Sequence, residues 1–272
     1  MNKLQKKLKI RSGDAILVGD LYTPERSKKK AAIIIETGLA LNRKGIFTEF
    51  AKFFADKGFP AFVYDKRSHN ESTGRFRCDQ LSKDLRNVIR HLTKQHHFKK
   101  FGLLGFCYGN IPIIEAAQDE QQVKVICGIN PYTNYFELFG YKNNQISFRH
   151  HMFHNLGLTL YKLKVRIPFD HKDFHIAPVP EGTGYHGNLS QLFKELAECR
   201  SAIGQVRLLK KPFHIFYGSR DRLVPIEEVK RIFNDCPSKD KQLHIYDQAG
   251  HFFEKQRQEM LSDCLSTFQK HL

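Results

Sequence analysis

Gly105-Phe106-Cys107-Tyr108-Gly109 is the stretch that decides how this chain is expected to fold. An apolar run from Phe101 to Leu104 precedes it and predicts a strand, and the run from Ile111 to Gln118 predicts the helix that follows. Small residues on both sides of one side chain, between a strand and a helix, are typical of the sharp turn that presents a nucleophile in a strained, exposed position. The side chain presented at this turn is the thiol of Cys107.

Two further motifs lie downstream of this turn. Asp221 stands in Tyr217-Gly218-Ser219-Arg220-Asp221, and His251 stands in Gln248-Ala249-Gly250-His251, each after a predicted strand. One such motif carries little information by itself, since most single cysteines are buried hydrophobic residues. Three motifs in the order nucleophile, acid, histidine, each at a strand end, argue against chance. We therefore predict Cys107, Asp221 and His251 as the catalytic residues.

Apolar strands alternate with amphipathic helices along most of the chain. Because strands that are apolar throughout are buried on both faces, this alternation predicts a parallel sheet covered by helices on both sides. The two opening β-rich segments, joined at Ser12-Gly13-Asp14, indicate an antiparallel start. The expected strands are Lys7–Arg11, Ala15–Tyr22, Ala31–Ile35, Ala61–Tyr64, Phe101–Leu104, Val123–Ile129, Pro212–Tyr217 and Leu243–Tyr246, and the expected helices are Gly45–Lys57, Gln80–Gln95, Ile111–Gln118, Ile226–Phe233 and a final one from about Phe253.

These features resemble the α/β-hydrolase superfamily, and within it the dienelactone-hydrolase-like enzymes, which carry a cysteine at this turn, and the polyketide-transferase-like hydrolases. Glu36-Thr37-Gly38-Leu39 stands where many members carry His-Gly-x, and Asp65 to Gly74 keeps the spacing D-x-R-x-x-x-x-S-x-G. Thr37 departs from the usual histidine, and Asn110 from a common second glycine. The resemblance implies an α/β-hydrolase fold, with a mostly parallel central sheet, helices on both faces and a cap insertion.

The alternation of strands and helices fails between Pro131 and Lys211. A connection of about eighty residues is far longer than an ordinary loop, which favours a functional insertion. Members of the superfamily carry a cap over the active site at this place. We therefore expect residues 1–130 and 212–272 to form the hydrolase core and residues 131–211 to form the cap. The aromatic and basic content of the cap suits substrate binding, without assigning single residues.

The predicted chemistry starts from the thiolate, because a thiol must lose its proton to act as a nucleophile. His251 would be the base, and Asp221 would fix its tautomer. The oxyanion of an acyl-transfer intermediate would be held by the backbone N–H groups of Tyr108 and Leu39. The resemblance also places Glu36 where dienelactone hydrolases have a glutamate that interacts with the resting cysteine; a hydrogen bond within the loop is the alternative role.

The residues leave three functions open. The first is an acyl-transfer enzyme with a Cys-His-Asp triad, an esterase or thioesterase that hydrolyses its substrate through an acyl-cysteine intermediate. The second is an acyltransferase that moves an acyl group from a carrier-protein or coenzyme A thioester to an acceptor. The third is a non-catalytic binding protein with a hydrolase fold, against which the presence of both Asp221 and His251 argues.

Composition limits the partners and the location. The 272 residues hold 44 Lys and Arg against 28 Asp and Glu, a formal net charge of +16. Because these cations are scattered and no nucleic-acid-binding module surrounds them, we expect an anionic or carrier-bound acyl substrate, such as that of an acidic acyl carrier protein, and not nucleic acid. The six cysteines show no C-x-x-C pair. Their spacing suggests neither a disulfide framework nor a structural metal site, and we expect no cofactor. No signal peptide or membrane-length apolar run is seen, so we expect a cytoplasmic protein.

Overall fold

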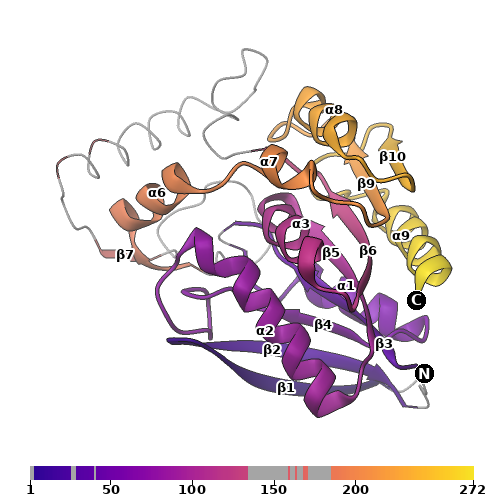
Figure 1. The fold of residues 1–272 in the computed structure, drawn as a ribbon, viewed down its shortest axis with the longest axis horizontal. Helices are drawn as coiled ribbons and strands as arrows, with labels where there is room; N and C mark the ends of the chain where they lie inside the picture. Colours follow the sequence, from indigo (N-terminus) through magenta and orange to yellow (C-terminus); the bar gives the residue numbers. More distant parts are fainter. Residues whose placement is uncertain are drawn as a thin grey trace.

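The computed structural model of the chain describes residues 3–25, 29–39, 41–133, 159, 163, 168–170 and 185–272. Within these residues, eight strands form one sheet in the order β1-β2-β4-β3-β5-β6-β9-β10 (Figure 1). The pairs β1–β2 and β2–β4 are antiparallel, and all later pairs are parallel. The strands are β1 Lys3–Ser12, β2 Ala15–Pro24, β3 Ala31–Glu36, β4 Ala61–Tyr64, β5 Lys100–Phe106, β6 Val123–Ile129, β9 Phe213–Gly218 and β10 Lys241–Tyr246. The α/β-hydrolase fold predicted from the sequence is confirmed.

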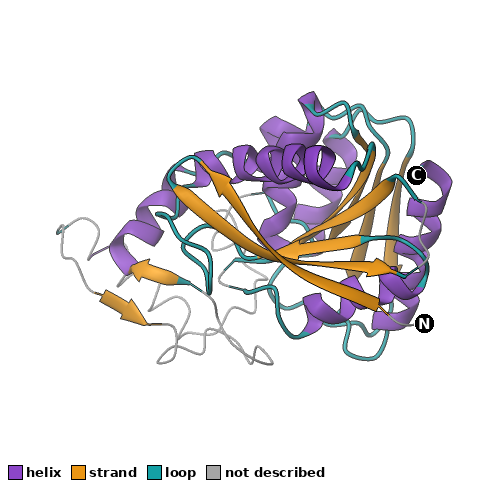
Figure 2. Cartoon of the chain, turned by 90° about the horizontal axis from the view of Figure 1, so that it is seen from below, coloured by secondary structure: helices purple, strands orange, loops and turns teal. Residues whose placement is uncertain are grey.

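Helices cover the sheet on both sides (Figure 2). One face carries α2 (Cys78–His96), α3 (Asn110–Asp119) and α8 (Ile226–Asp235), and the other carries α1 (Ile46–Asp56) and α9 (Arg257–His271). All six residues of the central strand β3 are buried. Since successive side chains of a strand point to opposite faces, both faces of the sheet must be covered at this strand. Ile34 joins the hydrophobic core on the α2 side, whereas Ile33 and Ile35 join the core on the α1 side.

The described part of residues 131–211 contains short elements. These are β7 (Pro168–Asp170), β8 (His186–Asn188), α6 (Leu189–Glu198) and α7 (Ala202–Val206). β7 and β8 pair with each other in a separate antiparallel sheet. Residues 134–158, 160–162, 164–167 and 171–184 lie outside the described residues. The division into a core and a cap therefore stays a prediction.

The last helix begins later than the sequence pattern indicates. It was expected from about Phe253, but α9 starts at Arg257. Phe253 has a φ of 52°, in the left-handed region, and the right-handed helix cannot begin there. Among the helices of the described residues, none has the length and apolar character needed to cross a membrane.

The turn after β5 is a close contact between two backbone segments. Cys107 has a φ of 54°, and the short 3-10 helix η1 (Cys107–Gly109) leads from it into α3. A Cβ atom at Gly109 would lie 2.4 Å from the carbonyl oxygen of Glu36 and 2.5 Å from that of Thr37. Glycine is therefore required at position 109 by the end of β3, and the turn is held against the segment that follows that strand.

We expect Gly109→Ala to lower the free energy of unfolding by about 1–3 kcal/mol, because backbone atoms must move to admit the methyl group. Gly204→Ala, within α7, is the matched control, since no described atom lies within 4 Å of its added Cβ. That control should stabilise the protein by about 0.5–1 kcal/mol through a better helix propensity. Urea unfolding followed by circular dichroism measures both; equal midpoints for the two variants would contradict the close contact.

Candidate active site

The predicted nucleophile stands on a strained backbone. Cys107 has a positive φ, which is rare for a residue with a side chain. This conformation costs free energy that interactions with the surroundings must offset. Asn110 helps to offset this cost, because its Nδ2 donates hydrogen bonds to the carbonyl oxygens of Cys107 (2.9 Å) and Ile129 (3.0 Å). Gly105 and Gly128 leave room for this amide, since an added Cβ would come within 3.0 Å and 2.5 Å of Asn110 Oδ1. The asparagine that departs from the superfamily pattern thus braces the turn.

Asp221 and His251 meet at the carboxyl end of the sheet, one after β9 and the other after β10. His251 Nδ1 lies 2.6 Å from Asp221 Oδ2. The other carboxylate oxygen, Oδ1, accepts the backbone N–H groups of Leu223 (2.7 Å) and Val224 (3.0 Å). The Asp221 side chain is fully buried, and these bonds leave it one orientation toward the imidazole. The second imidazole nitrogen of His251 is thereby available to the Cys107 thiol.

The charge of His251 follows from this environment. Burial alone lowers the pKa of an imidazole, but the Asp221 carboxylate and the hydrogen-bonded Cys107 sulfur outweigh burial and raise the pKa of His251 to about 10. The ring also packs edge-on against Phe106 and Phe252, with centroid separations of 5.0 and 5.1 Å. The structure thus brings Cys107, Asp221 and His251 together, with a protonated imidazole beside the Cys107 sulfur.

Asn130 connects the strands that carry the acid and the histidine, and sequence reasoning missed it. It directly follows β6 and has a φ of 43°, a conformation that asparagine tolerates better than most residues. Its Nδ2 donates to the carbonyl oxygen of His251 at 2.8 Å, and its Oδ1 accepts from the N–H of Gly218 at 3.1 Å. The only signal in the sequence was an asparagine directly after an apolar strand. Asparagine is common in turns, so this position does not indicate a bond to His251 or Gly218.

The loop that holds the predicted oxyanion donor Leu39 is fixed by a buried lysine. Lys66 donates to the carbonyl oxygens of Thr37 and Gly38, the latter at 3.3 Å, and to Thr37 Oγ1 at 2.7 Å. Leu39 follows these residues directly and packs, like Cys107, against the core on the α2 side. Lys66 therefore positions the segment from which the Leu39 N–H would donate. The second predicted donor, the N–H of Tyr108, follows the nucleophile within η1.

Glu36 has two partners in this buried group. Its carboxylate accepts a hydrogen bond from the Tyr64 hydroxyl and forms an ion pair with Lys66 at 3.2 Å. Burial raises the pKa of Glu36 and lowers the pKa of Lys66, and each charge partly offsets the effect on the other. The proposed modulator of the thiol is thus bonded to the lysine that holds the oxyanion loop. Sequence reasoning missed Lys66, because a lysine after a strand is usually exposed.

Asp65 and Arg67 organise the loops around the candidate site through buried ion pairs. Asp65 pairs with the buried Arg43, and its Oδ1 accepts the Arg43 backbone N–H at 2.8 Å. Arg67 forms two hydrogen bonds to the buried Asp84, at 2.7 and 2.8 Å. Buried charges of this kind are retained only when they are paired. These paired residues hold the loops around the candidate site in place.

Comparison with known proteins identifies the family. Residues 27–256 match the family model described as "Serine aminopeptidase, S33". This match spans most of the chain, and the protein therefore belongs to this family of α/β hydrolases. The family description names a serine, whereas the turn after β5 carries Cys107 in this chain.

One curated relative and two solved structures illustrate the likeness. The uncharacterized hydrolase YugF of Bacillus subtilis (strain 168) is 33% identical over 66 residues, which are 24% of this chain and only 23% of that protein. A soluble variant of monoglyceride lipase from Saccharomyces cerevisiae, solved with a substrate analog, superposes with a TM-score of 0.75 at 14% identity, over 99% of this chain and 96% of that one. Dienelactone hydrolase from Anabaena variabilis ATCC 29413 gives a TM-score of 0.66 at 14% identity, over 99% of both chains. Identities this low show a shared fold alone.

We expect the His251 imidazole to stay protonated as the pH rises through 8 and to lose its proton only near pH 10, because its pKa is raised. Nitrogen-15 NMR of the imidazole measures this directly. Asp221→Asn should move the titration midpoint to lower pH, since it removes the carboxylate charge that favours the imidazolium. His91, whose pKa burial lowers, serves as the internal reference and should be neutral at pH 8. A neutral His251 at pH 8 in the unmodified protein would contradict the ion pair between the His251 imidazolium and the Asp221 carboxylate.

Proposed function

We propose that this protein is an acyl-transfer enzyme that hydrolyses an ester or thioester through an acyl-cysteine intermediate. Cys107 is the nucleophile, His251 the general acid and base, and Asp221 the residue that orients His251. The observation that carries the proposal is the contact of a strained, positive-φ cysteine with a histidine that is bonded to a buried aspartate at 2.6 Å. A nucleophile, a base and a group that orients the base are the three parts that covalent catalysis requires.

The first half of the reaction forms the acyl-enzyme. The Cys107 thiolate attacks the acyl carbon, a carbon–sulfur bond forms, and the carbonyl electron pair moves to oxygen. The N–H groups of Tyr108 and Leu39 stabilise this oxyanion. When the oxyanion collapses, the bond to the leaving alcohol or thiol breaks, and the His251 imidazolium gives that group its proton. The histidine is then neutral, as the second half requires.

The second half releases the acyl group. Neutral His251 takes a proton from a water molecule, whose oxygen attacks the acyl carbon. The carbon–sulfur bond breaks, the carboxylic acid leaves, and the thiolate and imidazolium are restored. The same intermediate would react with an amine, alcohol or thiol acceptor if water were excluded by the proposed cap, residues 131–211. Product analysis with and without an added acceptor therefore distinguishes a hydrolase from an acyltransferase.

Cys107→Ala should abolish both turnover and covalent labelling, because the proposed acyl-enzyme forms on the Cys107 sulfur. Intact-protein mass spectrometry after incubation with a panel of activated esters and acyl thioesters measures the labelling. Cys236→Ala is the control and should keep the label. Cys236 is a buried free cysteine on the side of the sheet that carries α8, and its thiol donates to the Leu209 carbonyl oxygen. Unchanged turnover in a folded Cys107→Ala protein would overturn the proposal.

The role of Lys66 can be separated from the role of the thiol. The double variant Lys66→Met with Glu36→Gln removes both charges of the buried pair, so that neither is left uncompensated. If Lys66 acts by holding the oxyanion loop, kcat/KM should fall by roughly 10- to 100-fold. Alkylation of Cys107 by iodoacetamide needs the thiolate but no oxyanion donors, and its rate should stay nearly unchanged. Equal losses in both rates would show that the pair acts on the thiol instead.

A further inference from the structure

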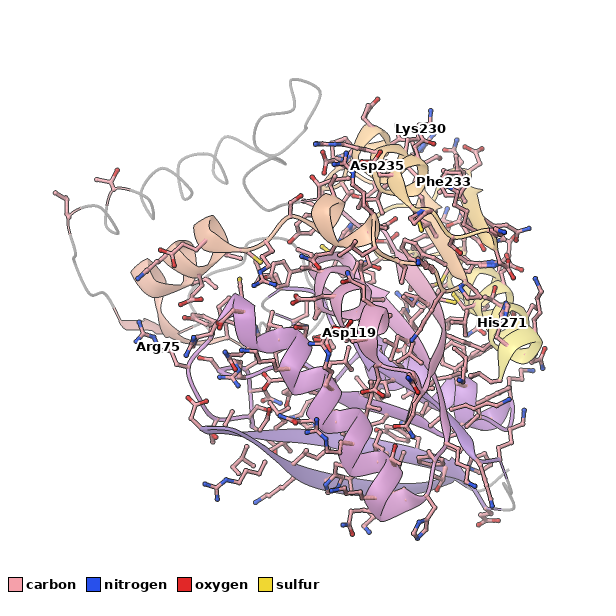
Figure 3. The ribbon with its side chains drawn as sticks, in the orientation of Figure 1. Arg75, Asp119, Lys230, Phe233, Asp235 and His271 are labelled. Carbon is pink, nitrogen blue, oxygen red and sulfur yellow. The ribbon has the colours of Figure 1, made fainter. Side chains whose placement is uncertain are left out.

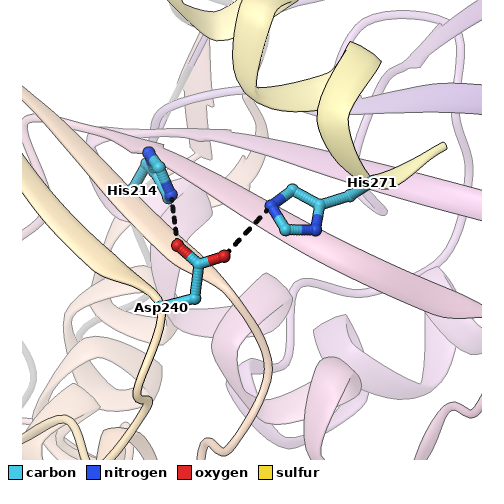
Figure 4. A group of neighbouring side chains, drawn as sticks. All are labelled: His214, Asp240 and His271. Carbon is cyan, nitrogen blue, oxygen red and sulfur yellow. Dashed lines mark hydrogen bonds and ion pairs between the residues drawn. The ribbon is translucent and has the colours of Figure 1, made fainter.

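Three side chains converge at the amino end of β9, at the opposite end of the strand from the candidate active site. His214 is the second residue of β9, Asp240 directly precedes β10, and His271, which is labelled in Figure 3, ends α9. Figure 4 shows the three side chains together. Asp240 Oδ1 lies 3.2 Å from His214 Nε2, and Asp240 Oδ2 lies 3.4 Å from His271 Nε2. No acyl-transfer step uses these residues. We propose that they form a binding site for a divalent transition-metal ion of the zinc type.

The spacing of the ligand atoms suits such an ion. One ligand atom from each of the three residues lies within 4.8 Å of the others. Two ligands bound to a tetrahedral zinc at about 2.1 Å lie roughly 3.4 Å apart, close to the two distances from Asp240. Two imidazoles and one carboxylate are a ligand set that zinc takes, with water in the fourth position. The two histidine nitrogens, which lie within 4.8 Å of each other, need to approach by about 1.4 Å at most.

One ligand nitrogen of the cluster also lacks a hydrogen bond within the described part of the chain. His271 Nε2 is buried and makes no hydrogen bond to any described residue, although it points toward Asp240 (Figure 4). A buried polar nitrogen without a hydrogen bond is costly, and a metal bond would satisfy it.

A second layer of contacts holds the ligands in place. Thr267 Oγ1 lies 3.3 Å from His214 Nδ1 and can give its own proton to the Asp263 carbonyl oxygen at 3.1 Å. Thr267 can therefore accept from Nδ1–H, which leaves Nε2 free for the metal, as is usual for zinc-bound histidines. Asp240 is fixed through its carbonyl oxygen, which accepts the Phe213 N–H at 3.0 Å. The site is thus largely formed by the fold itself.

Lys270 supplies a way to distinguish a metal site from a network of ion pairs. Its ammonium group lies 2.9 Å from Asp240 Oδ2, the oxygen that also faces His271, and its side chain is 61% exposed. A metal ion must compete with this cation, whereas a purely structural cluster depends on it. Removal of the Lys270 charge should therefore strengthen metal binding, but it should weaken a cluster held by ion pairs alone.

The test is a titration of the untagged, reduced protein with ZnCl2 by calorimetry, with thermal unfolding measured alongside. We expect one zinc per chain at this site and a rise in Tm of about 5 °C at saturating zinc. His271→Ala and Asp240→Asn should each weaken this binding about 100-fold or more, and Lys270→Gln should strengthen it severalfold. His91→Gln is the control: it removes a histidine that lies beside His96 on α2, and it should change nothing.

Cobalt(II) separates this site from the cysteines of the chain. Cobalt bound by nitrogen and oxygen gives visible bands without the near-ultraviolet charge-transfer band of a thiolate ligand, and those bands should disappear in His271→Ala. His214 is buried, so His214→Ala is secondary evidence only. Zinc affinity unchanged in both His271→Ala and Asp240→Asn, or zinc that leaves Tm unaffected, would overturn the proposal. Because no readout is catalytic, its failure would be independent of the proposed acyl transfer.

Discussion

The structure depends on the contact between the turn after β5 and the end of β3. Gly109 lies so close to the carbonyl oxygens of Glu36 and Thr37 that no side chain fits between them. This contact holds Cys107 in its left-handed conformation and sets the loop of Leu39 beside it. Backbone strain persists only where the surroundings determine it from several sides. The proposed nucleophile Cys107 and its proposed oxyanion donors are thereby positioned by one packing constraint, before any charge is considered.

Two buried charge systems then act on the two sides of this turn. On one side the Asp221 carboxylate and the Cys107 sulfur raise the pKa of His251 against the effect of burial. On the other side Lys66 holds the carbonyl oxygens of the Leu39 loop and pairs with Glu36. Because a charge in a dry interior must be compensated nearby, each buried group contains both a positive and a negative partner. In the proposed reaction His251 exchanges protons, whereas Lys66 only holds the loop of Leu39.

The sequence predicted the fold from β3 to α9, because apolar strands and amphipathic helices have distinct periods. It also named Cys107, Asp221 and His251, since parallel strands bring residues at their carboxyl ends to one edge, and the structure places these three together. Their catalytic roles stay a prediction. Asn130 and Lys66 were missed because their importance comes from carbonyl oxygens far away in the chain, which no local pattern encodes. The start of α9 was misplaced because Phe253 adopts a left-handed φ that no pattern of hydrophobic residues reveals.

The register between β9 and β10 sets the positions of residues at both ends of these two strands. The strands pair in parallel from Phe213 with Lys241 to Gly218 with Tyr246, and Asp221 and His251 lie on the loops that follow. A slip of one residue would turn every side chain of a strand to the other face. The 2.6 Å bond between His251 and Asp221 therefore requires this register. At the other end of the same strands, His214, Asp240 and His271 connect β9, the start of β10 and the end of α9. A metal ion bound there would fix the register at its start, and so would support the proposed catalytic geometry from the far side of the sheet without taking part in the chemistry.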